Sequence, residues 1–169
     1  EKSSPINGVW REEFYPFVRG PLDAADDIRC KRLVIYKASS AMGTVLGQVG
    51  MALHHKLCHT LGGSFDLPHA ETHAVILAHA IGYNAAAVPD LLAPITQIFG
   101  GTSPGQAIYD FAVKMKAPLA LRDLGLKETD LDRAADLATQ NPYWNPRPID
   151  RTTLRHLLQA AWAGDAPAV

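Results

Sequence analysis

The sequence is poor in the residues that mark several protein classes. Its 169 residues include only two cysteines, Cys30 and Cys58, and neither lies in a CxxC motif. Two cysteines cannot form a disulfide scaffold, so we expect a reducing, cytoplasmic compartment, although a single bridge stays compatible with the sequence. The formal net charge is −1 and no run of lysine or arginine occurs. This balance does not suggest a surface for nucleic acid or for anionic membranes.

Long apolar runs are also missing. No apolar stretch approaches the ~20 residues that a membrane-spanning helix needs. The first eight residues, EKSSPING, contain neither an initiator methionine nor the apolar segment of a signal peptide. We therefore expect no membrane span, and a chain that is a cut piece or a processed product of a longer protein.

Strand patterns are absent too, and helical patterns fill the chain. No segment of useful length alternates between apolar and polar residues, and there is no repeat or low-complexity tract. Helices are expected over residues 6–19 (weak, interrupted by Pro16), 24–61, 69–83, 88–99, 104–116, 131–140 and 152–164. The sequence therefore predicts an all-α helical bundle, built as a single domain over residues 1–169.

Capping residues mark the ends of these helices. The expected N-caps are Asp23, Ser103, Thr129 and Asp150, whose side-chain oxygens can accept a hydrogen bond from the first turn. Gly62-Gly63 is expected to end the helix over residues 24–61. Asn84 is expected to end the helix over residues 69–83, because asparagine tolerates the left-handed conformation.

The histidines are concentrated in one segment, since six of the seven fall within residues 54–79. His55 and His59 are four residues apart on one helix, and His69 and His73 repeat this spacing on the next, so each pair shares a face. The turn LGGSFDLP between them can fold the second helix back onto the first. Facing imidazoles are good ligands for a divalent transition metal. One helical histidine is usually structural, but two such pairs favour a functional site. No carboxylate obviously completes a metal-ligand set, since Glu71 points elsewhere on its helix.

The remaining reactive residues have structural interpretations. Cys58, beside His59, is either a thiol activated by imidazoles or a small buried apolar residue. His54 and His79 are expected to be bystanders of the site, and His156 is assigned no function. Tyr143 and Trp144 are expected to pack, and Arg147 to contact a helix end. We find no nucleophile–base–orienter set and no phosphate-binding loop.

The histidine segment resembles a family signature. The pattern H-x3-H-x-L-G followed by P-H, with fourteen residues from His55 to His69, resembles that of the iron-containing alcohol dehydrogenase superfamily. The runs GTVLGQVGMALHHKLCHTLGG, DLPHAETHAVIL and NPYWNPRP resemble the maleylacetate reductase family within it. The resemblance extends more loosely from Ser4 to Trp162. It implies the helical C-terminal domain of the dehydroquinate synthase-like fold.

The resemblance also implies roles for individual residues. His55 and His69 match two metal-coordinating histidines, for which iron or zinc is the expected ion, and His55 is thereby a catalytic candidate. His59 matches a histidine near the nicotinamide that serves in proton relay, which makes it a catalytic and cofactor-binding candidate. His73 and Lys56 could pair with substrate carboxylates.

The reaction that the resemblance implies is the reduction of the carbon–carbon double bond of maleylacetate by NADH or NADPH. The product would be 3-oxoadipate, in the aerobic degradation of aromatic compounds. A hydride would go to one alkene carbon and a proton from an imidazole to the other. Histidine suits this task because its ordinary pKa is about 6.5. The conjugated carbonyl would be polarised by an imidazolium or a metal.

The resemblance implies that some of the family's functional elements lie upstream of residue 1. The nucleotide-binding α/β domain and the other metal-ligand motif are both expected there, and the 169 residues contain neither. We therefore expect NADH or NADPH to be bound mainly by that domain or by a second chain. With two of the family's ligands, this chain alone is expected to hold a metal weakly or not at all. We also expect a homo-oligomer.

Three functional hypotheses follow. The chain is the C-terminal half of a maleylacetate reductase-like enzyme, active with its nucleotide-binding half on a small dicarboxylate substrate. Alternatively, it is a stand-alone truncated homologue repurposed as a cofactor-free catalyst or small-molecule binding protein. The third hypothesis is a purely structural helical domain. The histidine cluster disfavours the third, because buried imidazoles without partners are costly.

Overall fold

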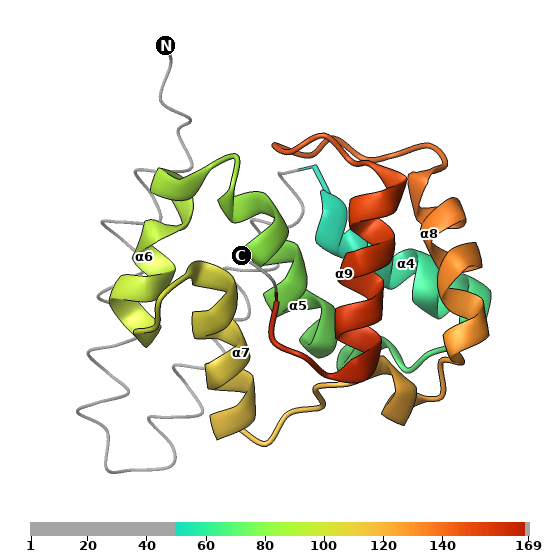
Figure 1. The fold of residues 1–169 in the computed structure, drawn as a ribbon, viewed down its shortest axis with the longest axis horizontal. Helices are drawn as coiled ribbons and strands as arrows, with labels where there is room; N and C mark the ends of the chain where they lie inside the picture. The colour runs from blue at the N-terminus through green and yellow to red at the C-terminus, as the bar shows by residue number, and fades with distance from the viewer. Residues whose placement is uncertain (1–49, 168–169) are drawn as a thin grey trace. The chain divides into compact units, whose positions relative to one another are not determined.

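The computed structural model describes residues 50–167 as α-helices joined by short 3-10 turns and loops, with no strand in this range (Figure 1). The α-helices are α4 (Leu53–Phe65), α5 (His69–Ala85), α6 (Pro89–Phe99), α7 (Pro104–Lys114), α8 (Leu131–Thr139) and α9 (Arg151–Ala163). The 3-10 turns are η2 (Leu121–Leu124) and η3 (Glu128–Asp130). The all-α prediction is confirmed.

The chain divides into two compact units, residues 1–50 and residues 51–169. All the helices named above belong to the second unit, and none of them is long and apolar enough to cross a membrane. The helix expected over residues 6–19, most of that over residues 24–61, and the Asp23 cap lie outside the described residues. One domain over the whole chain stays a prediction.

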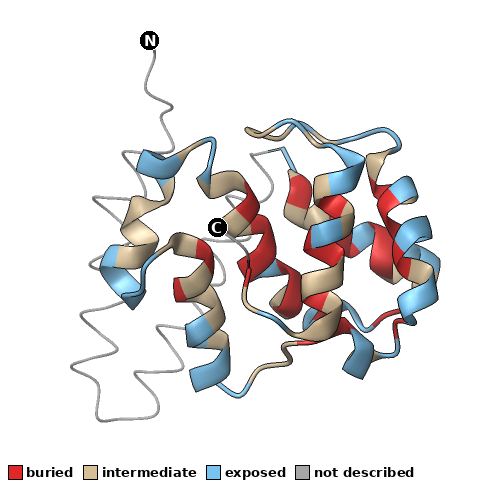
Figure 2. Cartoon of the chain, viewed as in Figure 1, coloured by how far each residue is buried: buried red, intermediate tan, exposed pale blue. Residues whose placement is uncertain are grey.

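Helix α5 is the centre of the packing. It contacts α4, α7 and α9, and Figure 1 shows it between α7 on one side and α9 on the other. α8 packs against α9 and α4. The core lies among α4, α5, α8 and α9, where the buried residues gather in Figure 2, whereas α6 has no buried residue. Burial of these apolar faces supplies most of the stability of such helices.

Leucines at every fourth position fix the orientation of α4. Leu53, Leu57 and Leu61 are fully buried, and residues four apart lie on one face of a helix. Each residue turns about 100° around the helix axis. His54 therefore flanks the buried stripe, and His55 lies farther round the helix. The leucine spacing thus decides which way the histidines of α4 point.

The predicted end of the α4 helix is wrong. α4 continues through Gly62 and Gly63 and ends at Phe65. Its C-cap Asp66 takes a left-handed φ of 56° and donates its N–H to the carbonyl of Leu61. Phe65 in this last turn is half-buried against the core, which offsets the helix propensity that the two glycines lack, roughly 1 kcal/mol each. The predicted continuity with residues before 53 is also wrong, because Ala52 is extended.

Two of the predicted N-caps in the described residues are confirmed. Ser103 Oγ accepts a hydrogen bond from the N–H of Gln106, and the Asp150 carboxylate accepts those of Thr152 and Thr153. The Thr129 cap is wrong. The chain enters α8 from η3 with helical backbone angles at Asp130, so no extended residue is available to cap it.

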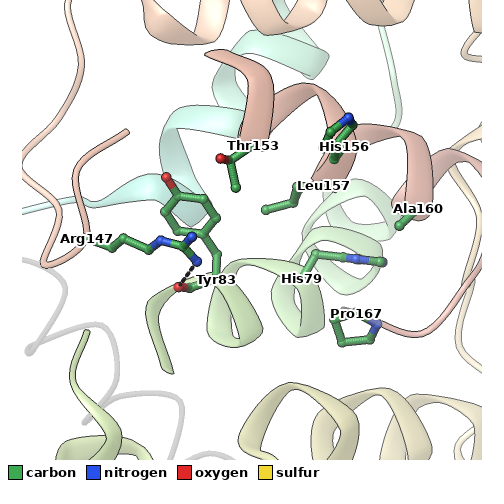
Figure 3. Close-up of a pocket in the computed structure, with 8 residues that line it drawn as sticks. All are labelled: His79, Tyr83, Arg147, Thr153, His156, Leu157, Ala160 and Pro167. Carbon is green, nitrogen blue, oxygen red and sulfur yellow. Dashed lines mark hydrogen bonds between the residues drawn. The ribbon is translucent and has the colours of Figure 1, made fainter. Parts of the chain in front are cut away.

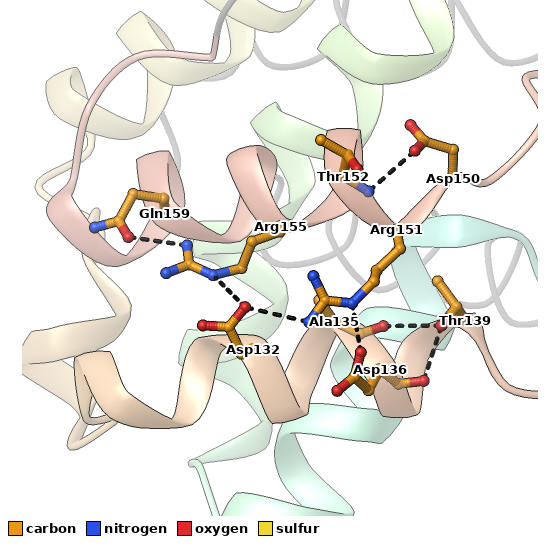
Figure 4. A network of polar contacts seen from close by, with 9 residues as sticks. All are labelled: Asp132, Ala135, Asp136, Thr139, Asp150, Arg151, Thr152, Arg155 and Gln159. Atoms are coloured by element: carbon orange, nitrogen blue, oxygen red, sulfur yellow. Dashed lines mark hydrogen bonds and ion pairs between the residues drawn. The ribbon is translucent and has the colours of Figure 1, made fainter.

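Ion pairs also join α8 to α9 (Figure 4). Arg151 Nε lies 2.5 Å from an oxygen of Asp136, and its NH2 lies 3.2 Å from Asp132. Arg155 lies 3.5 Å from the same Asp132 oxygen. Because these carboxylates are largely exposed, the pairs contribute little to the stability of the fold. The buried leucines and alanines between the two helices matter more.

The close approach of α7 to α5 needs a glycine. A Cβ on Gly105 of α7 would lie 2.8 Å from the Cα of Gly82 and 3.0 Å from the carbonyl oxygen of Ala78, both on α5. We expect Gly105→Ala to force these backbones apart and to lower the free energy of unfolding by roughly 1–3 kcal/mol. Urea denaturation measures this change.

Gly63 provides the matched control for that substitution. A Cβ there meets no heavy atom within 4 Å. Gly63→Ala should therefore leave stability unchanged or raise it by up to about 1 kcal/mol, because alanine is the better helix former. Equal stability of the Gly105→Ala variant and the wild-type chain would contradict the close packing of α5 on α7.

Candidate active site: the histidine cluster of α4 and α5

The structure brings the two predicted histidine pairs together. The ring centroids of His55 and His73 are 5.2 Å apart, and those of His69 and His73 are 4.2 Å apart. His59 lies one turn along α4, with its ring centroid 5.9 Å from that of His55. The turn after α4 folds α5 back against it, as the spacing predicts. We refer to these four residues and His54 as the histidine cluster.

His54, predicted to be a bystander, lies inside the cluster. Its ring centroid is 4.8 Å from that of His73 and 5.2 Å from that of His55. The Nε2 of His54 donates a hydrogen bond to the carbonyl oxygen of His73 at 3.1 Å. Sequence spacing missed this residue because it is not part of an i, i+4 pair. Its place beside the leucine stripe is the signal that could have identified it.

Three members of the cluster have the geometry of a metal-ligand group. His54, His55 and His73 each offer a ring nitrogen, and these three atoms lie within 4.8 Å of one another. The Nε2 of His73 is buried and has no hydrogen-bond partner among the described residues. His69 contacts His73 but is not a member of this group.

Burial keeps the imidazoles of this group neutral. Burial is the main cause that lowers the pKa of His54, His55 and His73. For His73 the pKa falls to about 4. Neighbouring imidazoles lower each pKa further, since a second positive charge close by is unfavourable. Neutral imidazole is the form that binds a metal ion.

His59 lies on the exposed side of the cluster. Its Nδ1 is 3.3 Å from the hydroxyl oxygen of Tyr143, and the Nζ of Lys56 lies 5.5 Å from the centroid of the Tyr143 ring. The sequence predicted only a packing role for Tyr143. Its hydrogen bond to His59 depends on a loop that joins α8 to α9, 84 residues along the chain.

Cys58 is a core residue. Its side chain is 1% exposed, and burial raises the pKa of its thiol to about 12. A thiol in this state does not supply the reactive thiolate. Of the two interpretations of Cys58, the structure favours the small buried apolar residue.

An amide pair holds the first turn of α4 in place. Asn145 Oδ1 accepts hydrogen bonds from the N–H of Leu53 at 3.3 Å and from Asn84 Nδ2 at 3.1 Å. In return, Asn145 Nδ2 donates to Asn84 Oδ1 at 2.7 Å. α5 ends at Ala85, one residue past the predicted end at Asn84, but Asn84 does not take the left-handed conformation expected of it, and its amide is used in this pair.

The same loop makes a further contact with α5. Arg147 donates from NH1 to the carbonyl of Tyr83 at 3.1 Å and stacks on the Tyr83 ring at 4.2 Å from its centroid. The predicted helix-end contact of Arg147 is therefore present. Trp144, which we expected to pack, is 78% exposed.

Asn145→Ala should lower the free energy of unfolding by roughly 1–3 kcal/mol, because it leaves the Leu53 N–H and the Asn84 amide without their partner. The exposed Gln140 gives a control, since Gln140→Ala in the preceding residues should change stability by less than about 0.5 kcal/mol. Chemical denaturation of both variants tests this. Equal effects of the two substitutions would mean that the amide pair does not anchor α4.

A cavity of about 220 Å³ lies on the other side of α5, between α5 and α9 (Figure 3). Its lining residues include His79, Tyr83, Arg147 and His156. His79 is 3% exposed, and burial lowers its pKa to about 4, an effect that Asp165 opposes in part. Its buried position agrees with the structural role that the sequence suggested.

His79 should make the fold sensitive to acid. Its folded-state pKa lies below the unfolded value of 6.5, so the unfolded chain takes up the proton first as the pH falls. Above about pH 6.5 His79 is neutral in both states and costs no stability. Between about pH 6.5 and pH 4, its protonation in the unfolded chain lowers the free energy of unfolding by up to about 3 kcal/mol. His79→Gln should remove that part of the loss. Urea denaturation at pH 7 and pH 5 tests it, with His156→Gln, on the exposed face, as the control. An unchanged pH dependence in His79→Gln would contradict the assignment.

Comparison with known proteins identifies the class. A family model for the C-terminal part of the Fe-containing alcohol dehydrogenase family matches residues 18–162. The chain therefore belongs to the Fe-containing alcohol dehydrogenase family and represents its C-terminal region.

Within the family, the chain is similar to maleylacetate reductases. It is 55% identical to maleylacetate reductase of Rhizobium sp. (strain MTP-10005) over 141 residues, which cover 83% of this chain and 40% of that protein. It is 44% identical to maleylacetate reductase 1 of Rhodococcus opacus, over 98% of this chain and 47% of that protein. The crystal structure of maleylacetate reductase from Agrobacterium tumefaciens matches with a TM-score of 0.83 and 49% identity, over 97% of this chain and 47% of that one. The chain thus spans less than half the length of these relatives.

Proposed function

We propose that the chain is the helical half of a maleylacetate reductase, an oxidoreductase that reduces maleylacetate to 3-oxoadipate with NADH or NADPH. The observation that carries the proposal is the exposed His59, paired with Tyr143 beside a cluster of neutral imidazoles. The identity to maleylacetate reductases of 44–55% supports it. The alternative of a stand-alone, repurposed domain gains no support from these comparisons.

The reaction adds one hydride and one proton across a carbon–carbon double bond, and the nicotinamide supplies the hydride. His59 is our candidate for the proton donor. As the imidazolium, His59 donates its Nδ1–H to the Tyr143 hydroxyl oxygen and holds its other proton on Nε2, from which that proton can pass to the substrate carbon and leave a neutral ring. Tyr143 then orients the ring and fixes its tautomer.

Lys56 is our candidate for binding a substrate carboxylate. It lies beside the Tyr143 ring and thus on the same side of α4 as His59. An ammonium group is a suitable partner for a carboxylate. His73 is the second candidate, as a neutral imidazole that donates one hydrogen bond.

The family name implies iron, and the histidine cluster fits a divalent transition metal. Its imidazoles are kept neutral, and the buried His73 Nε2 has no partner among the described residues. His55 and His69 are the ligands that the resemblance implies. When bound, such an ion polarises a carbonyl oxygen. The side chains of the site bind the substrate, orient it and supply the proton.

We extend the proposal to the parts of the relatives that this chain does not match. The relatives are more than twice as long as the matched region. We place the main NADH or NADPH contacts on a nucleotide-binding domain or a second chain, with His59 at the nicotinamide. A homo-oligomer in the cytoplasm is our expectation for the complete enzyme.

Fusing this chain to the N-terminal half of the Rhizobium sp. relative tests the function. The fusion should oxidise NADH when maleylacetate is added, and His59→Gln should lower kcat by roughly 10²–10⁴-fold, the usual contribution of an acid–base group. Tyr143→Phe should have a smaller effect, since Tyr143 only orients His59. His156→Gln is the control. Full turnover by the His59→Gln fusion would exclude His59 as the proton donor. Turnover of maleylacetate by the lone chain without nucleotide would overturn the proposed function.

A further inference from the structure

The cavity between α5 and α9 has no part in the proposed reaction (Figure 3). Two residues four positions apart, His79 and Tyr83, form its wall on α5. One face of α9 and the segments on either side of that helix complete the lining, with Arg147, Thr153, His156, Leu157, Ala160 and Pro167. The cavity is therefore separate from the histidine cluster, and its chemistry can be considered by itself.

One end of the cavity is cationic. The Arg147 guanidinium lies over the Tyr83 ring and donates from NH1 to the Tyr83 carbonyl oxygen. These contacts hold the planar group in place and leave most of its five N–H donors available. The nearby Asp150 carboxylate accepts hydrogen bonds from the first turn of α9, and Arg147 forms no ion pair within residues 50–167. A carboxylate suits such a guanidinium best, because it can accept two parallel hydrogen bonds.

The remaining walls are mostly apolar. Leu157, Ala160 and Pro167 contribute aliphatic groups, and Tyr83 contributes its ring. The cavity volume is about 220 Å³. An apolar protein cavity of about 150 Å³ takes up benzene. This cavity therefore has room for one six-membered ring with short substituents.

His79 provides an independent sign of a ligand. Its side chain is 3% exposed, lines the cavity, and has no hydrogen-bond partner among the described residues. A buried polar group without a partner is costly, so a polar group of a ligand would stabilise this ring. Burial lowers the pKa of His79 to about 4, so its neutral ring can donate one hydrogen bond and accept another. A hydroxyl group matches both capacities.

We propose that this cavity binds a small organic acid that carries a hydroxyl group on an apolar ring. The carboxylate pairs with Arg147, the ring packs against Leu157, and the hydroxyl group bonds to His79. Figure 3 shows the guanidinium beside Tyr83 and the His79 imidazole farther along α5, so the two polar contacts lie at separate places in the cavity. This site is additional to the one that we assign to maleylacetate.

Titration of the full 169-residue chain with 3- and 4-hydroxybenzoate, followed by nuclear magnetic resonance, tests the proposal. One isomer should bind with a Kd of about 1 mM or below, and amide signals of α5 and α9 around the cavity should shift. Benzoate, without the hydroxyl group, should bind roughly 3–10-fold more weakly, and phenol, without the carboxylate, at least about tenfold more weakly. Acetate binding as tight as that of the hydroxybenzoates would indicate a simple anion site and overturn the proposal.

Two variants assign the polar contacts. Arg147→Gln should weaken binding by roughly 10–100-fold, the usual effect of losing hydrogen bonds to a charged group. Arg122→Gln is the matched control, since the Arg122 guanidinium lies over the Trp162 ring and outside the cavity, and it should bind as the wild type does. In His79→Leu, benzoate and the hydroxybenzoates should bind equally, because the partner of the hydroxyl group is gone.

A third variant fills the cavity. Ala160→Leu should abolish binding without lowering stability, and it keeps the test decisive if Arg147→Gln does not fold. Lys56→Gln separates this cavity from the candidate active site, where Lys56 is the proposed carboxylate partner. Binding lost in Lys56→Gln but retained in Arg147→Gln would overturn the proposal, as would the absence of binding by either hydroxybenzoate. Circular dichroism checks the fold of each variant, and no step of this test depends on reductase activity.

Discussion

The burial of three leucines on α4 is the constraint on which the candidate site depends. Leu53, Leu57 and Leu61 have no solvent exposure and pack in the core with residues of α5, α8 and α9. A helix whose apolar stripe is buried cannot rotate about its axis without exposing that stripe to water. The direction of every other side chain on α4 is therefore set by these contacts. His54 is brought to the carbonyl of His73 by this orientation.

A single loop then completes both ends of the site. The segment between α8 and α9 supplies Asn145, which holds the first turn of α4, and Tyr143, which pairs with His59 two turns later. The two contacts fix the start and the middle of the same helix from one side, while α5 fixes it from the other. The loop therefore bears on both groups: on the candidate proton donor through Tyr143, and on the metal-ligand group through the contact of Asn145 with the turn of α4 that carries His54 and His55.

Much of the fold could be predicted from the sequence because local interactions decide it. The caps at Ser103 and Asp150 use side chains within three residues of the N–H groups that they bind. The end of α4 could not be predicted from Gly62-Gly63, because the contact of Phe65 with the core and the left-handed cap at Asp66 lie beyond the two glycines. The two histidine pairs follow from spacing on adjacent helices. The place of His54 and the partner of His59 do not, since they depend on the rotation of α4 and on the distant Tyr143.

The amide pair of Asn145 also bears on the order in which the molecule is assembled. Leu53 and Asn145 are 92 positions apart, whereas the contacts within a helix span three or four residues. Closing such a large loop costs conformational entropy before the contact contributes any stability. During synthesis, α4 and α5 leave the ribosome long before the loop that anchors them. The first turn of α4 can therefore take up its anchor only after that loop has been made, whereas α4 and α5, which are adjacent in the chain, contact each other directly.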